Sequence, residues 1–239
     1  MRKRKTSAAK LVAIVAVFAA LNVVTDSFGG LPSSGVWYSW NFLIEPLTGI
    51  LLGPLLGFAA TFIGVMIGHW VYFIDTYEFL FTIGAPIGVA VSALLFKEKW
   101  KPVLVYYTIL FTAYFITPVA WQLPLLGMWD TYIAFAVLFV VIFLIKKDFW
   151  KHKTKKLPFI LAITAFVGLE ADVLFRIFLL IPCQTYRLFY GWDIATLQYI
   201  WGGGAVITPI KVAVSTIATM TIGQPLIKTL RKTGFLIHH

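Results

Sequence analysis

The chain has 239 residues, of which 60% are hydrophobic and 13% are charged, and its mean hydropathy is +0.87. Soluble domains contain about 45–50% apolar and about 25% charged residues, so this composition excludes a water-soluble globular protein and predicts one integral membrane domain over residues 1–239. The nine Trp and ten Tyr residues agree with this, because amphipathic rings collect at membrane–water interfaces.

The N-terminus carries a basic run at 2–5, followed by an apolar stretch that ends near residue 24. Cleavable signal peptides and first transmembrane helices share this pattern. No convincing small-residue cleavage site precedes the polar stretch 25–27, and further apolar segments follow at once. We therefore expect a retained first helix.

Further apolar runs predict further membrane-crossing helices, since a span needs about 20 apolar residues. The sequence contains eight hydrophobic segments in all: 8–25, 41–53, 55–74, 79–96, 102–122, 130–145, 157–181 and 201–228. The run 41–53 is too short to cross upright unless the bilayer thins or the run meets a water-filled cavity. The sequence thus predicts an all-α polytopic membrane protein.

The basic residues are distributed unevenly among the connections. With a cytoplasmic N-terminus, the inner segments 1–10, 97–101, 146–156 and 228–239 hold 17 of the 20 Lys and Arg residues. This asymmetry predicts that both termini are cytoplasmic, in a prokaryotic plasma membrane. The net charge of +10 is then an orientation signal, and no nucleic-acid partner is expected. The opposite loops hold Asp26, Asp75, Glu78, Asp130, Asp193 and, among the bases, only Arg187.

Three stretches carry a family resemblance. Four alanines of the first segment lie on one helical stripe, where small residues allow another helix to approach closely in lipid. Residues 45–57 read EPLTGILLGPLLG and are followed by Gly64 and Gly68, and the last segment contains GQPL at 223–226 before a basic tail. These stretches resemble the substrate-binding (S) subunit of energy-coupling factor (ECF) vitamin transporters. The alanines are Ala9, Ala13, Ala16 and Ala20.

The resemblance implies a six-helix core that captures a small organic micronutrient near the outer surface. It also implies that the four alanines dock onto a separate transmembrane coupling subunit, which works with two cytoplasmic ATPase subunits. Eight segments exceed a six-helix core. Either a hairpin has been added within 102–145, or the count divides the chain too finely, so no binding residue is carried over from the middle.

Several polar side chains fall inside the apolar segments. A charge at mid-bilayer costs about 2.5–3.5 kcal/mol on insertion scales, so each needs a partner or a function. Asp172 and Arg176 are four residues apart on one helical face, which predicts an ion pair. Glu170 and Lys211 fall at similar depths on different helices, which favours an interhelical pair, either as structural glue or as the polar floor of a pocket.

Acids, amides and a histidine coincide with aromatic residues near the predicted outer ends, which indicates a ligand pocket that opens outward. The loops 26–40 and 182–200 would close it as mobile lids, the first without regular structure because it is rich in Gly, Pro and Ser. The candidate substrate-binding residues are Trp37, Trp40, Asn41, Glu45, His69, Glu170, Arg176, Tyr186 and Lys211.

The chain lacks the Walker lysine loop and the H-E-x-x-H and G-x-S-x-G motifs, so no catalytic residue, metal or cofactor is expected. Cys183 is expected to be a small buried residue. The expected function is a membrane-embedded binding subunit for ATP-driven uptake by separate subunits. Two alternatives stay open: an intramembrane enzyme that acts on a lipid-linked substrate through Glu170, Asp172 and Arg176, and a self-sufficient secondary transporter. The charge of the ligand also stays open.

Overall fold

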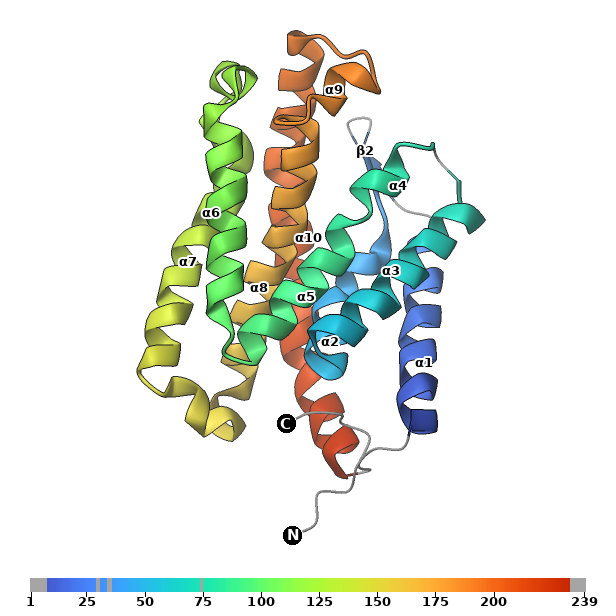
Figure 1. Ribbon diagram of the computed structural model, residues 1–239, viewed down its shortest axis with the longest axis vertical. Helices are drawn as coiled ribbons and strands as arrows, with labels where there is room; N and C mark the ends of the chain where they lie inside the picture. The colour runs from blue at the N-terminus through green and yellow to red at the C-terminus, as the bar shows by residue number, and fades with distance from the viewer. Residues whose placement is uncertain (1–7, 29–30, 34–35, 74, 233–239) are drawn as a thin grey trace.

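The computed structural model describes the backbone of residues 8–28, 31–33, 36–73 and 75–232, and the side chains of these residues except 31–33, 36–38, 151–155 and 231 (Figure 1). Helices predominate, and η denotes a 3-10 helix. In chain order the elements are α1 (Ala8–Ser27), β1 (Leu31–Ser33), β2 (Val36–Tyr38), η1 (Trp40–Leu43), α2 (Glu45–Leu52), α3 (Pro54–Val71), α4 (Glu78–Phe81), α5 (Gly84–Phe96), α6 (Trp100–Ile116), η2 (Pro118–Gln122), η3 (Leu125–Met128), α7 (Trp129–Lys146), η4 (Phe149–His152), α8 (Lys153–Leu180), α9 (Thr185–Leu188) and α10 (Ile194–Lys232).

Six helices of the described chain are long and apolar enough to cross a membrane, and α6 is a shorter apolar helix. The chain is therefore an all-α polytopic membrane protein, as the composition predicts. The two short strands are the exception: β1 and β2 pair in an antiparallel hairpin. This hairpin lies within the loop 26–40, so the prediction that the loop lacks regular structure is wrong.

The predicted segment 41–53 does not form a full span. It forms η1 and the eight-residue α2, which is about 12 Å long at 1.5 Å per residue. Every residue of α2 is buried, and Gly53, with φ of 85°, turns the chain directly into α3. A positive φ is accessible to glycine at little cost, so this position favours glycine. The count of eight crossing segments is thus too high at this point.

The first turn of α1 and the last turn of α10 lie at the same end of the molecule, the lower end in Figure 1. The lysine-rich connections from α5 to α6 and from α7 to α8 lie toward that end too, while α9 and the β-hairpin lie at the opposite end. We call the two ends the terminal end and the α9 end. The predicted separation of basic connections from acidic ones therefore follows the long axis of the bundle.

Helix α8 is the centre of the bundle and packs against α5, α6, α7 and α10. Its contact with α5 is close because small residues meet there. A Cβ atom added at Gly84 or Gly88 of α5 would overlap Asp172 or the backbone of Gly168 on α8, and one added at Gly168 would overlap Ser92. Close approach through small residues is the usual way for helices to gain contact area in lipid.

Helix α1 packs on α3 through its polar face. A Cβ atom added at Gly64 would overlap Asn22, and one added at Gly68 would lie 2.6 Å from Asp26 Oδ2. The glycines of α3 thus make room for two polar side chains of α1, both buried. The alanine stripe of α1 points away from this contact, and all four of its alanines are exposed.

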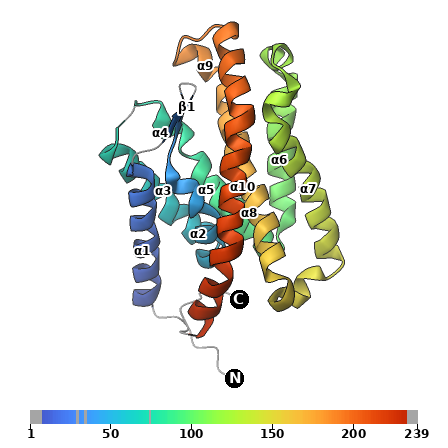
Figure 2. The same ribbon diagram turned by 180° about the vertical axis from the view of Figure 1, so that it is seen from behind.

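Helix α10 begins at Ile194, seven residues before its predicted start at 201, and runs for 39 residues (Figure 2). The glycines 202–204 therefore lie inside the helix and not at its entry. Pro209 has no N–H to donate to the carbonyl of Ala205, four residues earlier. Trp129 Nε1 of α7 donates to that carbonyl instead, at 2.9 Å, so the proline is accommodated without an unsatisfied backbone group.

Candidate binding site

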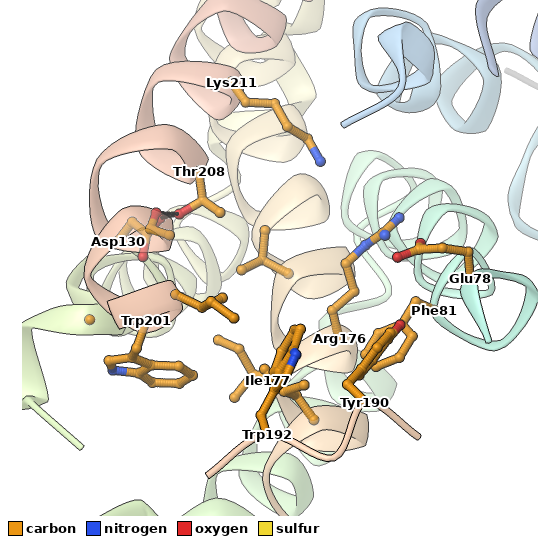
Figure 3. A pocket seen from close by; sticks show the side chains of 15 residues that line it. Glu78, Phe81, Asp130, Arg176, Ile177, Tyr190, Trp192, Trp201, Thr208 and Lys211 are labelled. Carbon is orange, nitrogen blue, oxygen red and sulfur yellow. Dashed lines mark hydrogen bonds between the residues drawn. The ribbon is translucent and has the colours of Figure 1, made fainter. Parts of the chain in front are cut away.

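A cavity of about 130 Å³ lies between α4, α8 and α10 at the α9 end. Its walls are mostly apolar, and a few charged groups converge on it, as Figure 3 shows. Concave, mostly apolar sites with a few placed polar groups are typical of small-molecule binding. The lining residues are Glu78, Phe81, Gly127, Asp130, Val173, Arg176, Ile177, Leu180, Tyr190, Trp192, Ile200, Trp201, Gly204, Thr208 and Lys211.

Two cations that line this cavity, Arg176 and Lys211, share one buried aspartate behind the wall. Arg176 Nε donates to Asp172 Oδ1 at 2.8 Å, which confirms the predicted ion pair within α8. Lys211 Nζ of α10 lies 3.8 Å from Asp172 Oδ2. Lys211 therefore pairs with Asp172 and not, as predicted, with Glu170. Asp172 itself is completely buried, because Gly84 and Gly88 bring α5 against it.

Glu78 lies opposite this pair, and its carboxylate and the Arg176 guanidinium point toward each other in Figure 3. Glu78 is buried at the start of α4, and Asp130 is buried in the first turn of α7. Asp26 is buried near the end of α1. The prediction that these three acids lie in the outer loops is therefore wrong; each occupies the last or first turn of a helix and is buried.

A chain of hydrogen bonds connects the cavity to Glu170. Thr208 Oγ1 donates to Asp130 Oδ2 at 2.6 Å, and the Thr131 backbone N–H donates to Asp130 Oδ1 at 3.0 Å. Thr131 Oγ1 donates to Glu170 Oε2 at 3.1 Å. Glu170 is completely buried and does not line the cavity, so it supports the Asp130 wall from behind.

Aromatic rings cover the cavity at the α9 end. Tyr190 and Trp192, which follow α9, stack with ring centroids 4.6 Å apart, and Tyr77 stacks on Phe189 at 4.3 Å. Burial raises the pKa of the Tyr190 phenol, so the group stays neutral and keeps its O–H. The loop 182–200 therefore supplies a cover, as predicted, but a folded one that includes α9 and the first turns of α10.

Trp201 forms the opposite wall and is held in place on three sides. Its Nε1 donates to the carbonyl of Pro124 at 3.0 Å, and its ring stacks on Tyr114 with centroids 6.0 Å apart. A Cβ atom added at Gly127 would overlap the indole. The ring is thus fixed before any ligand arrives, and such preorganisation reduces the entropy cost of binding.

A second, smaller pocket of about 10 Å³ adjoins the cavity toward α2 and α3. The two share Glu78, Arg176 and Lys211, which form the boundary between them. We call this second space the inner pocket. Its lining residues are Ser39, Phe42, Glu45, His69, Glu78, Thr82, Arg176 and Lys211.

Glu45 is the deepest acid of the inner pocket and is 3% exposed. Asn41 Nδ2 donates to Glu45 Oε1 at 3.3 Å, and Thr25 Oγ1 of α1 donates to Asn41 Oδ1 at 3.2 Å. The second oxygen, Oε2, has no hydrogen-bond partner among the described residues. His69 Nδ1 lies 2.5 Å from Asp26 Oδ2, which joins α3 to α1 behind the pocket.

The structure brings together four of the predicted binding residues, namely Glu45, His69, Arg176 and Lys211, around the boundary of the two pockets. Asn41 contacts them through Glu45. The other predicted residues lie elsewhere. Trp40 packs on Phe42 with centroids 6.0 Å apart, Glu170 lies behind the cavity wall, Tyr186 is buried in α9 without lining either pocket, and the side chain of Trp37 lies outside the described residues.

Sequence reasoning missed several cavity residues. Glu78 directly precedes the predicted segment 79–96 and Asp130 is the first residue of the predicted segment 130–145, and such a position is where a helix begins and where its first turn can point inward. A sharper signal exists in α5, where Gly84, Gly88 and Ser92 recur every fourth residue and mark a close helix contact. Cys183 was expected to be buried and is exposed, because it lies in the turn after α8.

Within the described residues, no group of three or more His, Cys, Asp or Glu side chains could hold a metal ion. Comparison of the chain with protein-family models, curated proteins and solved structures found no match. The fold and the cavity therefore define the class by themselves: a polytopic helical membrane protein with a ring-lined, charge-bearing cavity at the end opposite its termini.

Proposed function

We propose that the chain is the substrate-binding subunit of an ECF-type importer in a prokaryotic plasma membrane. It captures a vitamin-like small molecule from outside and delivers it together with a separate coupling subunit and two ATPase subunits. The observation that carries the proposal is the cavity at the α9 end, which combines fixed aromatic walls with converging charges.

A purely structural role does not require such a cavity. Buried ion pairs that only hold helices together are enclosed by packing, since unfilled space forfeits contact energy. Here Arg176 is 28% exposed while its partner Asp172 is completely buried, so the guanidinium faces open space. Charged groups that border open space, here Arg176 and Glu78, are suited to orient a ligand.

The second support is the outer face of α1. The four alanines of its stripe are exposed along one side of the helix, where methyl groups let another backbone approach. Beside the stripe, an apolar groove of about 670 Å³ is bounded by α1, α2 and α10 and includes Ala13. A face of this kind is suited to a transmembrane partner, as an importer without its own ATPase motif requires.

The first test is the composition of the complex. Affinity-tagged protein purified in mild detergent from the membranes of its own source should carry a transmembrane coupling protein and two nucleotide-binding subunits in fixed stoichiometry. Mass spectrometry of the molecules released on denaturation identifies the bound ligand. Accumulation of that ligand by vesicles that contain this chain alone, driven by an ion gradient, would overturn the proposal in favour of a secondary transporter.

The second test separates binding from coupling. Ala16→Trp places a large ring on the stripe and should abolish complex formation and reduce uptake at least tenfold, while ligand binding to the isolated chain changes less than twofold. The matched control is Ala136→Trp, because Ala136 is also an exposed alanine but lies on α7, away from α1. If both variants assemble and transport like the unmodified chain, the stripe is not a docking face.

A further inference from the structure

We infer that the site selects a small organic cation, with its positive nitrogen beside Glu78 and Glu45 and its apolar body between the aromatic walls. This inference rests on the proposed function for its setting, and it names the ligand charge, which the sequence leaves open. It is carried by the charge inventory of the site, the unpartnered oxygen of Glu45, the commitment of both cations to Asp172 and the rings around the cavity.

The site contains more buried acidic groups than basic ones. At the α9 half of the bundle, Asp26 is paired with His69. Beyond that pair, this half of the bundle holds five buried carboxyl groups and two cations that line the cavity, Arg176 and Lys211. An excess of buried carboxylates is costly unless protons or cations compensate it. A cationic ligand would reduce the excess, whereas an anionic one would increase it. The five acids are Glu45, Glu78, Asp130, Glu170 and Asp172.

Both cations are already committed to one aspartate. Arg176 binds Oδ1 of Asp172, and Lys211 approaches Oδ2, so a single carboxylate separates the two positive groups. The ammonium of Lys211 also lies 5.6 Å from the ring centroid of Phe42. An anion placed between Arg176 and Lys211 would lie beside the carboxylate of Asp172, which would repel it and which is completely buried and fixed by Gly84 and Gly88.

Glu45 Oε2 is the unpartnered carboxylate oxygen that borders a pocket; Glu170 Oε1 and Asp172 Oδ2 also lack a donor among the described residues, but neither residue lines the cavity or the inner pocket. Glu45 Oε2 is buried, it lines the inner pocket, and no hydrogen bond reaches it from the described residues. A buried acceptor without a donor costs about 1–3 kcal/mol. A donor nitrogen of the ligand would remove that cost, and a ligand carboxylate has no proton to give.

The sizes of the two spaces decide how the ligand lies. The inner pocket, at about 10 Å³, has room for one water-sized group, whereas the cavity, at about 130 Å³, has room for the body of a small molecule. Glu78 lines both spaces and so reaches the nitrogen at the boundary. Tyr190, Trp192 and Trp201 surround the cavity with π-faces, which attract cations as well as apolar groups.

Benzamidine and benzoate provide a matched pair of probes, because both are flat and similar in size but opposite in charge. Binding to the purified chain in detergent is measured by calorimetry at pH 7. We expect benzamidine to bind at least tenfold more tightly than benzoate. Benzoate binding that equals or exceeds benzamidine binding, or failure of both probes to bind, overturns the inference.

Two kinds of variant should change the affinity for benzamidine in opposite directions. Glu45→Gln and Glu78→Gln should each weaken benzamidine binding at least fivefold, while Lys211→Met should leave it unchanged or strengthen it. If the site bound an anion instead, Lys211→Met would weaken ligand binding. Asp193→Asn is the control, because Asp193 is an exposed acid at the α9 end that does not line either pocket. Thermal unfolding of each variant shows that the chain is folded.

The proposed ligand charge and the proposed transport role can be disproved independently of each other. If benzoate binds better than benzamidine while the ATPase subunits still copurify, the ligand charge is wrong and the transport role stands. If benzamidine binds selectively while no coupling or ATPase subunit copurifies, the cation site stands and the transport role is wrong.

Discussion

Two buried ion pairs in this protein are built alike and differ in what surrounds them. Asp26 of α1 meets His69 of α3, and Asp172 of α8 meets Arg176 and Lys211. Each aspartate lies against a glycine of a neighbouring helix, Gly68 in the first case and Gly84 in the second. The same device, a glycine that admits a carboxylate into a helix contact, thus occurs twice.

The two pairs differ in the surroundings of the basic partner, His69 in the first and Arg176 in the second. The His69 and Asp26 side chains are 7% and 2% exposed, and the pair borders only the small inner pocket, through His69. Arg176 instead borders a cavity together with Glu78, and further acids surround it. We propose that the first pair fixes α1 to α3, and that the second holds charges for a ligand. Two experiments test this distinction, and a third tests the helix start beside the cavity cover; they follow in order of decreasing expected effect.

The largest effect is expected at the glycine beside the second pair. Gly84→Leu would force a side chain into Asp172, and overpacking of this kind should lower the free energy of unfolding by about 3 kcal/mol. Gly202→Leu is the matched control, since nothing lies within 4 Å of a Cβ atom there. Thermal unfolding in detergent, followed by tryptophan fluorescence, compares the two. Equal losses would show that the α5–α8 contact is not tightly packed.

An intermediate effect is expected from the aspartates themselves. Asp172→Asn leaves two cations without their shared partner and should cost about 2 kcal/mol, reduced from the fully buried case by the exposure of Arg176. Asp26→Asn should cost about 1 kcal/mol, because the His69 ring can still form a hydrogen bond with the amide. Adding Lys211→Met to Asp172→Asn should recover part of the loss. A larger loss from Asp26→Asn would reverse our assignment of the two pairs.

The smallest effect is expected at Asp193, directly before the start of α10. The Thr196 backbone N–H donates to Asp193 at 2.8 Å, which lowers the pKa of that carboxyl. A lowered pKa means that the bond stabilises the helix start above the unfolded pKa of about 3.9 and is lost as the pH falls through the folded value. Asp193→Ala should therefore speed amide exchange in the first turn of α10 at pH 7, after correction for intrinsic rates, and this effect should shrink as the pH falls through the folded pKa of Asp193.

Hydropathy and charge were enough to predict the helical class, the placement of the basic connections and most helix positions, because lipid imposes length and polarity on every span. Hydropathy failed at α2. This segment is as apolar as a membrane-spanning helix, although its eight residues are buried among other helices. Apolarity alone does not distinguish a lipid-facing segment from one buried in protein.

The site, too, could be predicted only in part, because local spacing determines some of its contacts and tertiary packing determines the others. The i,i+4 spacing fixes the contact between Asp172 and Arg176 locally, so the sequence contains it. The partner of Lys211 depends on how α10 rotates against α8, and that rotation is set by packing across the whole bundle. Tyr190 and Trp192 cover the cavity because the chain folds back after α9, which no local pattern encodes.

The length of α10 has one more consequence. Its 39 residues extend over about 58 Å, roughly twice the hydrocarbon thickness of a bilayer of about 30 Å. Helices of 17 or 18 residues, such as α6 and α7, match that thickness much more closely. A substantial part of α10 must therefore project past the acyl chains, and its first turns stand beside α9 (Figure 2). The cover of the cavity would then lie among lipid headgroups, where water-borne solutes arrive without having to dissolve in the hydrocarbon.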